Sequence, residues 1–218
     1  MNYIEPVLLK ELHEADYDSL IRYRIRKILM ICSNYDAFIL EEDGQIESQI
    51  YREYIELNLS NSPKFVWVTT SEEARAVMNS SNDIDLVISM FNMGDLEVFQ
   101  LASDLKEQGK NIPFVLLTHF SKEVYKRLSL QNTSGIDYMF SWHGNADLIL
   151  AIVKLLEDRI NADHDILEVG VQAILLVEDS VRYYSTYLPE LYKLILKQCA
   201  EFMKETLNEQ QRKGRKRS

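Results

Sequence analysis

Cysteine and long apolar runs are scarce in this sequence, and each shortage excludes a class of protein. The chain of 218 residues has 2 cysteines, Cys32 and Cys199, without a CxxC pair or a Cys/His cluster. A disulfide framework and a zinc site are therefore not indicated, and a cytoplasmic location is expected. The longest uninterrupted apolar run covers only residues 148–153, whereas a membrane-spanning helix needs about 20 residues. We therefore predict no membrane segment.

The common catalytic and nucleotide-binding motifs are absent as well. The sequence contains no GxGxxG, GxxxxGKS/T, HExxH or GxSxG. Dinucleotide-binding, P-loop, zinc-protease and hydrolase functions therefore have no motif to support them. We predict that this chain is not itself an enzyme and that it holds no cofactor.

The charge balance argues against nucleic acid as a partner. The net charge is −10, although the tail of residues 212–217 carries five cations, so the rest of the chain carries −15. An acidic body repels a phosphate backbone, because nucleic-acid affinity comes from lysines and arginines that neutralise phosphates. The basic tail is therefore predicted to be a solvated linker or chain end.

Short β-rich runs alternate with segments of helical length. This order is typical of a parallel sheet that helices cover on both faces, in a doubly wound α/β fold. We predict five strands, which lie at residues 27–32, 65–69, 85–89, 113–118 and 137–140.

The segments between these runs carry apolar residues at helical spacing. The first has one apolar face, formed by Ile46, Ile50, Tyr54 and Leu57. A further helix covers about residues 122–130. Three residues are predicted to mark other helix ends: Ser71 as an N-cap, Gly109 as a stop, and Asn145 as the N-cap of a helix that continues to Ile160.

The two ends of the chain lie outside this pattern. Residues 1–24 mix apolar and charged residues and are predicted to form a helical extension. Residues 161–170 are predicted to be a polar linker. A new apolar run at 173–180 and an amphipathic helix to about residue 207 follow, which make an extra βα unit. One such unit cannot bury both faces of a sheet, so it is either truncated or completed by another chain.

Several of these runs resemble parts of a response-regulator receiver domain, the CheY-like family. Residues 174–180 resemble its opening strand, which ends in two carboxylates, here Glu178 and Asp179, that help to hold Mg²⁺. Residues 86–93 resemble its third strand and exit, and Thr118 matches the hydroxyl residue after strand four. The resemblance implies a flavodoxin/CheY-like sheet of order 2-1-3-4-5 for a receiver domain at 25–160, and the start of a second receiver-like domain at 171–218.

At the functional positions of the family, however, the sequence departs from the pattern. Cys32 and Ser33 stand where the acid pair belongs, Met90 where the acceptor aspartate belongs, and Ser141 where the lysine belongs. Only Thr118 is retained. An acyl phosphate needs a carboxylate nucleophile, and phosphoryl transfer needs metal and cationic side chains. The resemblance therefore implies a degenerate receiver without phosphorylation chemistry.

Other residues near these loops keep alternatives open. Asp36 and Asp95 lie near the phosphorylation-site loops and are off-motif candidates for a phosphate acceptor. Glu178 and Asp179 could bind Mg²⁺ only if the second domain is completed. The other candidates are aromatic: Trp142 and His143 as a contact surface, and the group Tyr183, Tyr184, Tyr187 and Tyr192 as part core and part surface.

Two functions follow from the resemblance. The first is a non-phosphorylatable receiver-like module that regulates or assembles through a protein partner or through itself, as a homodimer or by strand exchange through 171–207. The alternative comes from residues 163–193, which look like the tandem receiver-like region ahead of pyruvate, phosphate dikinase type modules that bind phosphoenolpyruvate and pyruvate. The chain would then be the regulatory region of a phosphotransferase whose catalytic part is absent here.

Overall fold

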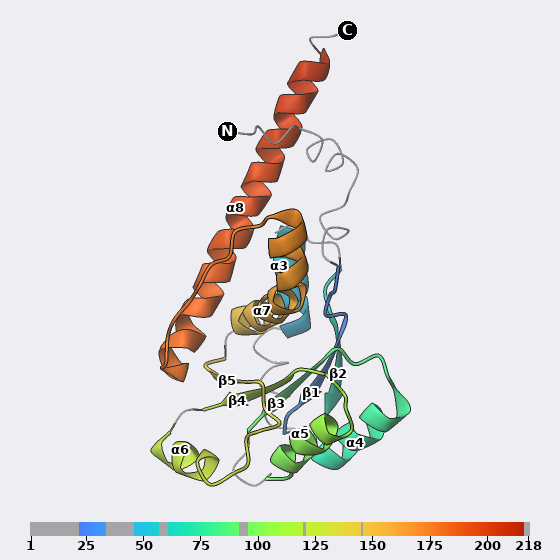
Figure 1. Ribbon diagram of the computed structural model, residues 1–218, viewed down its shortest axis with the longest axis vertical. Helices are drawn as coiled ribbons and strands as arrows, with labels where there is room; N and C mark the ends of the chain where they lie inside the picture. The colour runs from blue at the N-terminus through green and yellow to red at the C-terminus, as the bar shows by residue number, and fades with distance from the viewer. Residues whose placement is uncertain are drawn as a thin grey trace.

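A five-stranded parallel sheet forms the centre of the molecule (Figure 1). The computed structural model describes residues 22–33, 46–56, 61–91, 96–119, 121–144 and 146–215. The strands are β1 (Lys27–Ile31), β2 (Lys64–Val68), β3 (Leu86–Met90), β4 (Phe114–Thr118) and β5 (Tyr138–Ser141). Their order, β2-β1-β3-β4-β5, confirms the predicted flavodoxin/CheY-like fold.

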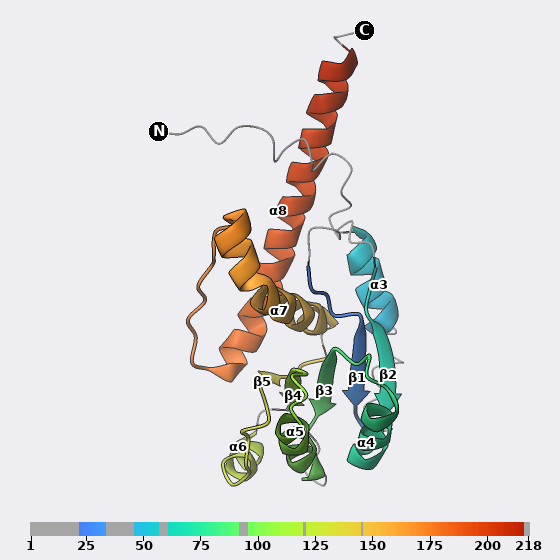
Figure 2. The same cartoon turned by 45° about the vertical axis from the view of Figure 1, so that its right-hand side comes forward.

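Helices cover both faces of the sheet, so the domain has two apolar cores (Figure 2). On one face lie α3 (Ile46–Glu56) and α7 (Ala146–His164). On the other lie α4 (Ser71–Ser80), α5 (Glu97–Glu107) and α6 (Lys122–Leu128). This arrangement confirms the prediction of a doubly wound α/β fold.

The strand sequences explain why the sheet is buried on both sides. Ile28 and Met30 of β1 point into the core under α3 and α7, whereas Leu29 and Ile31 point into the core under α4 to α6. Every residue of β3 and β4 is buried. A strand covered on both faces needs apolar residues at successive positions, and for this reason these strands appear in the sequence as continuous apolar runs.

Helix boundaries agree with the sequence at one predicted position and differ at another. Gly109, with φ +70°, follows α5, as predicted. The N-cap of α4, however, is Thr70 and not Ser71: the Thr70 side chain accepts a hydrogen bond from the Glu73 N–H, and the Glu73 carboxylate accepts from the Thr69 N–H at 2.7 Å. This reciprocal arrangement is similar to a capping box, except that the Glu73 carboxylate bonds to the N–H of the residue before the N-cap. Ser71 is then the buried first residue of the helix.

Some predictions fall outside the described residues. These predictions concern Leu57, Asn145 and residues 1–21 of the predicted N-terminal extension. Residues 22–24, which are described, are not helical.

The predicted linker at 161–170 is helical over most of its length, because helix α7 continues to His164 and is followed by a π-helical turn, η2 (Asp165–Val169). One of the polar residues that indicated a linker, Asn161, is used inside the structure. The Asn161 side-chain amide donates to the Tyr23 carbonyl at 2.8 Å, and its oxygen accepts from the Tyr23 N–H at 2.9 Å. Asn161 is therefore buried, and it fixes the backbone that leads into β1.

The predicted strand at 173–180 does not form in this chain. Residues 170–180 have neither helix nor strand structure, and α8 (Val181–Arg215) follows them. A strand needs a neighbour to complete its ladder, and the described part of the chain supplies none here. The start of α8 packs against α7 and β5 of the same domain, and its end extends away from the sheet (Figure 1). That residues 171–218 open a second domain stays a prediction.

Candidate functional site

The positions that the receiver resemblance matches to a phosphorylation site lie together at the carboxyl ends of the strands, called here the strand-end edge of the sheet. Met90, Thr118 and Ser141 are the last residues of β3, β4 and β5, and Cys32 directly follows β1. Thr118 lies opposite Ser141 in the β4/β5 register. In open parallel sheets, ligands bind outside the carboxyl ends of the strands, at the point where the strand order reverses. The structure therefore brings these predicted positions together where such a site would lie.

Among the described residues, the strand ends carry no charged side chain and are largely closed to solvent. The exposed fractions of Cys32, Met90, Thr118 and Ser141 are 2%, 9%, 1% and 1%, and Ser33 is half-buried. Cys32 and Met90 belong to the apolar core under α3 and α7. A thiol, a thioether and the Ser141 hydroxyl occupy the positions where the receiver resemblance expects carboxylates and a cation, whereas Thr118 keeps the expected hydroxyl.

The Thr118 side chain is unusual in its hydrogen bonding. Its buried hydroxyl oxygen has no hydrogen-bond partner in the described part of the chain. A buried polar group without a partner costs stability, typically about 1–3 kcal/mol. The hydroxyl therefore gives the fold no stabilising bond that would explain its presence.

Ser141 connects this edge to helix α8. Its backbone N–H donates to the Ser185 hydroxyl oxygen at 2.7 Å, and the Ser185 hydroxyl donates to the Val181 carbonyl at 2.6 Å. Ser185 is itself buried. The position that matches the receiver's lysine is therefore bound to a helix 44 residues further along the chain, a contact that no sequence motif announces.

Of the two residues of the predicted contact surface, Trp142 and His143, the structure leaves only His143 exposed. Trp142 is 5% exposed and belongs to the core, so its side chain is not available to a partner. The prediction is wrong for Trp142 because its backbone continues the sheet, with its N–H bonded to the Thr118 carbonyl at 2.9 Å. His143 is exposed, and its Nδ1 lies 3.1 Å from the Ser141 carbonyl.

Helix α8 docks on β5 and α7 through one apolar face. Tyr184 stacks on Phe140 of β5, with 5.3 Å between ring centroids. Leu188, Tyr192 and Leu196 continue this face and are all buried. Burial raises the pKa of Tyr184 to about 12. The first half of α8 is thus part of the domain's packing.

Polar contacts at the rim of α8 reinforce this docking. The Tyr192 hydroxyl donates to the Asp158 carboxylate at 2.7 Å. Burial raises the pKa of Asp158, and the hydrogen bond from Tyr192 opposes that rise. Lys193 Nζ lies 2.8 Å from the Asp147 carboxylate of α7 and 3.7 Å from Glu53 of α3.

The tyrosine group divides as predicted into core and surface. Tyr184 and Tyr192 contact the domain, whereas Tyr183 and Tyr187 are 54% and 50% exposed and stack on each other. Their outward face is available to another surface.

A buried ion pair under α7 was not foreseen from the sequence. Lys154 and Glu157 are joined at 2.7 Å, with side chains 5% and 3% exposed. Lys154 also lies over the Tyr54 ring of α3, and Glu157 accepts a hydrogen bond from the Ile25 N–H. The pair holds α7, α3 and the entry to β1 together.

Two of the remaining candidates, Glu178 and Asp179, lie in the segment directly before α8. The Glu178 carboxylate accepts from the Ser180 N–H at 2.9 Å, directly before α8, and Asp179 is exposed. Within the described ranges, no three His, Cys, Asp or Glu side chains converge as metal ligands. Asp36 and Asp95 lie outside the described residues. Among the helices of the described ranges, none combines the length and the apolar character that crossing a membrane requires.

Comparisons with known proteins give only distant structural similarities. No protein-family model and no curated protein matches the sequence. The receiver domain of a Francisella response regulator is 20% identical with a TM-score of 0.45, and the match covers 62% of this chain and 98% of that chain. A Thermotoga maritima response regulator, solved in complex with Mg²⁺ and BeF, is 21% identical with a TM-score of 0.44, over 60% and 98%.

A third solved structure is the C-terminus of Escherichia coli RcsC, which contains a linker region and a phosphoreceiver domain. It is 17% identical with a TM-score of 0.44, and the match covers 73% of this chain and 62% of that chain. At such low similarity the fold assignment rests on the strand order and register, and the site must be interpreted from its own residues.

Proposed function

We propose that this chain is a receiver-like regulatory or interaction module in signal transduction, which acts through protein contacts and not through phosphorylation of an aspartate. One observation carries the proposal. At the sheet edge where receivers carry out their chemistry, the strand ends present Cys32, Met90, Thr118 and Ser141, and Ser141 is bonded to Ser185 of α8. A cytoplasmic location stays a prediction.

The chemistry of an aspartyl switch explains why these residues matter. An acyl phosphate forms only when a carboxylate attacks the phosphodonor. Mg²⁺ takes oxygen ligands, and the transferred group needs positive charge beside it. Neither the thioether of Met90 nor the hydroxyl of Ser141 can take these roles, and Cys32 lies in an apolar core.

Helix α8 supplies the alternative means of action. It occupies the surface formed by β5 and α7 and makes an ordered contact with Ser141. Tyr183 and Tyr187 face outward from the same helix. A partner that contacts α8 would therefore be connected directly to the sheet edge, with no covalent modification.

Covalent labelling tests this proposal. The purified chain is incubated with acetyl phosphate and Mg²⁺, and its intact mass is measured beside that of a phosphorylatable receiver protein as a positive control. We expect the control alone to gain a phosphoryl group. A phosphorylated chain would overturn the proposal, and the separate variants Asp36→Asn and Asp95→Asn would then identify an off-motif acceptor.

A second candidate function is supported by residues 171–180. This segment has no strand partner in the described part of the chain, and its apolar side chains are exposed. Such a segment suits a chain that continues into further strands, as in the regulatory region of a pyruvate, phosphate dikinase type phosphotransferase. The test is to assay the longest polypeptide encoded by the gene for phosphoryl exchange with ATP, phosphoenolpyruvate and pyruvate. Activity that changes when residues 1–218 are deleted would support it, and the absence of a catalytic region would reject it.

A further inference from the structure

The sheet has one edge without a partner in the described part of the chain. β5 lies at one end of the sheet, where α8 packs against it, and β2 lies at the other end. The Lys64 N–H donates to the Arg26 carbonyl at 2.8 Å, and the Val68 carbonyl accepts from the residue after β1 at 3.1 Å. Alternate residues of a strand bond to the same neighbour, so the backbone groups of Phe65 and Trp67 point away from the sheet.

The chain also has one strand-like segment without a sheet. Residues 171–177 carry no charge. Val171, Ile174, Leu175 and Val177 are 53%, 67%, 86% and 83% exposed, and Leu176 is 38% exposed. Contiguous exposed apolar side chains mark interaction sites, and an unpaired sheet edge is a template for another strand.

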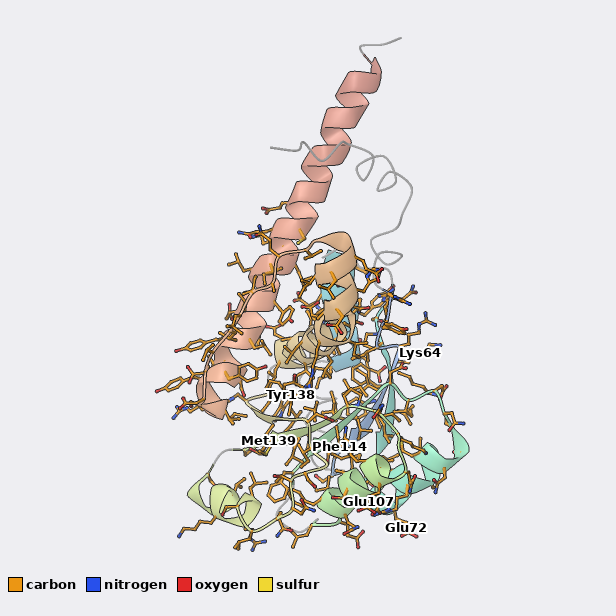
Figure 3. The ribbon with its side chains drawn as sticks, viewed as in Figure 1. Lys64, Glu72, Glu107, Phe114, Tyr138 and Met139 are labelled. Atoms are coloured by element: carbon orange, nitrogen blue, oxygen red, sulfur yellow. The ribbon has the colours of Figure 1, made fainter. Side chains whose placement is uncertain are left out.

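The segment cannot reach the free edge of its own sheet. Strands are spaced about 4.8 Å apart, so β2 and β5 lie roughly 20 Å from each other, and Lys64 and Tyr138 lie at opposite ends of the sheet (Figure 3). The segment is held on the β5 side, because α8 is docked there and the Val171 N–H donates to the Asp165 carbonyl at 2.9 Å. Within the described residues, each copy thus has an unpaired edge at β2 and a strand-like segment on the opposite side of the sheet, an arrangement that a second copy can complement.

We propose that residues 174–178 of one copy add as an antiparallel strand to β2 of a second copy. This inference rests on the proposed function as a contact module, and it names the partner and the surface. Strand addition of this kind takes its affinity from main-chain hydrogen bonds and its specificity from alternate side chains.

The charges around β2 determine the direction of the added strand. Lys64 lies at the start of β2, and Arg24 donates to the backbone carbonyl three residues before it. At the other end, Glu47 accepts a hydrogen bond from the indole of Trp67, and Glu73 accepts from the N–H directly after the strand. A parallel strand would place its terminal acids beside these glutamates, whereas an antiparallel strand places them beside the cations.

The same charges set the register. With Glu178 opposite Lys64, the further pairs are Val177 with Phe65, Leu176 with Val66, Leu175 with Trp67, and Ile174 with Val68. The half-buried Phe65 and Trp67 pack against the core under α3 and α7, and Val66 packs against the core under α4 to α6. The added strand therefore extends both cores, because opposite residues of an antiparallel pair lie on the same face.

Leucine substitutions test the contact. Leu175→Lys alters the segment, and Leu130→Lys is the matched control, since the two leucines are 86% and 82% exposed. In sedimentation equilibrium, we expect the unaltered chain and the control to form dimers by reciprocal exchange, or larger head-to-tail species. We expect Leu175→Lys to weaken self-association about tenfold or more, since burial of a leucine side chain contributes at least that factor. A monomeric unaltered chain would overturn the inference.

Charge reversal tests the direction. We expect Lys64→Glu to weaken self-association about twofold to fivefold for each contact, the range of exposed cross-strand pairs. Combining it with Glu178→Lys should restore the affinity. Lys126→Glu makes the same charge change on an exposed residue of α6 and should have no effect. Equal losses from Lys64→Glu and Lys126→Glu, or no restoration in the double variant, would contradict the antiparallel register.

Cross-linking tests the register itself. Val66 and Leu176 form a pair without ladder hydrogen bonds, for which Cα atoms lie about 4.5 Å apart, close enough for a disulfide. In a Cys199→Ser background, the double variant Val66→Cys and Leu176→Cys should form linked oligomers on mild oxidation. A chain with Val66→Cys and Val171→Cys, which is out of register, should not.

The two proposals fail in different ways. Self-association together with phosphoryl uptake from acetyl phosphate would contradict the proposed function and leave the strand contact intact. A chain that takes no phosphoryl group and remains monomeric would contradict the strand contact alone.

Discussion

The hydrogen bond from Tyr192 to Asp158 offers a sharp test of how α8 is held. Tyr192→Phe removes one oxygen atom and keeps the ring that packs on the domain. Tyr192 is 8% exposed, and its hydroxyl lies 2.7 Å from the Asp158 carboxylate. The substitution therefore leaves the Asp158 carboxylate, an exposed side chain of α7, without this donor.

The magnitude follows from the burial of the Tyr192 donor and the exposure of the Asp158 acceptor. Because solvent can replace the lost donor at an exposed carboxylate, we expect a cost of about 0.5–1.5 kcal/mol of unfolding free energy. In a chain of this length, each kcal/mol lowers the melting temperature by about 2–4 °C. The loss will appear in global unfolding, or as faster hydrogen exchange along residues 181–197 if α8 undocks first.

The effect should depend on pH with a definite sign. Burial raises the folded-state pKa of Asp158 above its ordinary value of 3.8. Its contribution to stability is therefore fully present below the unfolded-state pKa and is lost as the pH rises through the folded-state pKa. Without the Tyr192 donor the folded-state pKa rises further. The variant should then lose most stability at pH 7 and less at pH 4, where the carboxyl gains a proton more readily.

Urea denaturation at the two pH values measures both effects. Tyr187→Phe is the matched control, because it removes the same atom from a tyrosine of α8 that is 50% exposed. We expect no change in its unfolding free energy. Equal losses for Tyr192→Phe at pH 7 and pH 4, or equal losses in the two variants, would refute the reasoning.

Three further substitutions test the packing. Thr118→Val replaces an unpartnered buried hydroxyl with a methyl group, so the urea midpoint should stay constant or rise, by up to about 1–3 kcal/mol in unfolding free energy. Gly135→Ala places a Cβ against the backbone of Ala102, and calorimetry should show a loss of about 1–3 kcal/mol. Glu157→Gln leaves the buried Lys154 unpaired, which should cost about 3–5 kcal/mol in urea denaturation, whereas adding Lys154→Met should recover part of that loss.

The sheet could be predicted because its signal is local. Ile28 to Ile31 are four successive apolar residues, and the structure places them alternately in two cores. Such a run is needed wherever a parallel strand is covered on both faces. The alternation of five such runs with helical segments predicted the doubly wound parallel sheet, because crossover rules leave few topologies, whereas the strand order came from the receiver resemblance.

Most predictions that differ from the structure concern residues whose conformation depends on contacts with residues far away in the sequence. Asn161 appears in the sequence as part of a polar linker, but its amide is buried by the backbone of Tyr23, 138 residues earlier. Residues 173–180 have strand composition, yet the described chain offers them no ladder partner. Thr70 and Ser71 are both good caps, and the reach of the Glu73 carboxylate to Thr69 decides between them.

The sequence indicated which residues lie at the candidate site, but not which other residues surround them. The sequence alone placed Met90, Thr118 and Ser141 at the ends of three strands, because the receiver resemblance aligns them in order. It could not show that Ser185 bonds to Ser141, since a serine within a helix carries no signal for a partner 44 residues away. Nor did it show that Trp142 is core, because the residue after a strand can continue the ladder or leave it.

The most direct test of the central claim is the melting temperature of the chain with Mg²⁺ and beryllofluoride, which together imitate a phosphorylated aspartate. A ligand that binds only the folded state raises the melting temperature. We predict the same melting temperature with and without these additives, because the strand ends carry no carboxylate or cation to hold them. A rise that requires both Mg²⁺ and beryllofluoride would contradict the account.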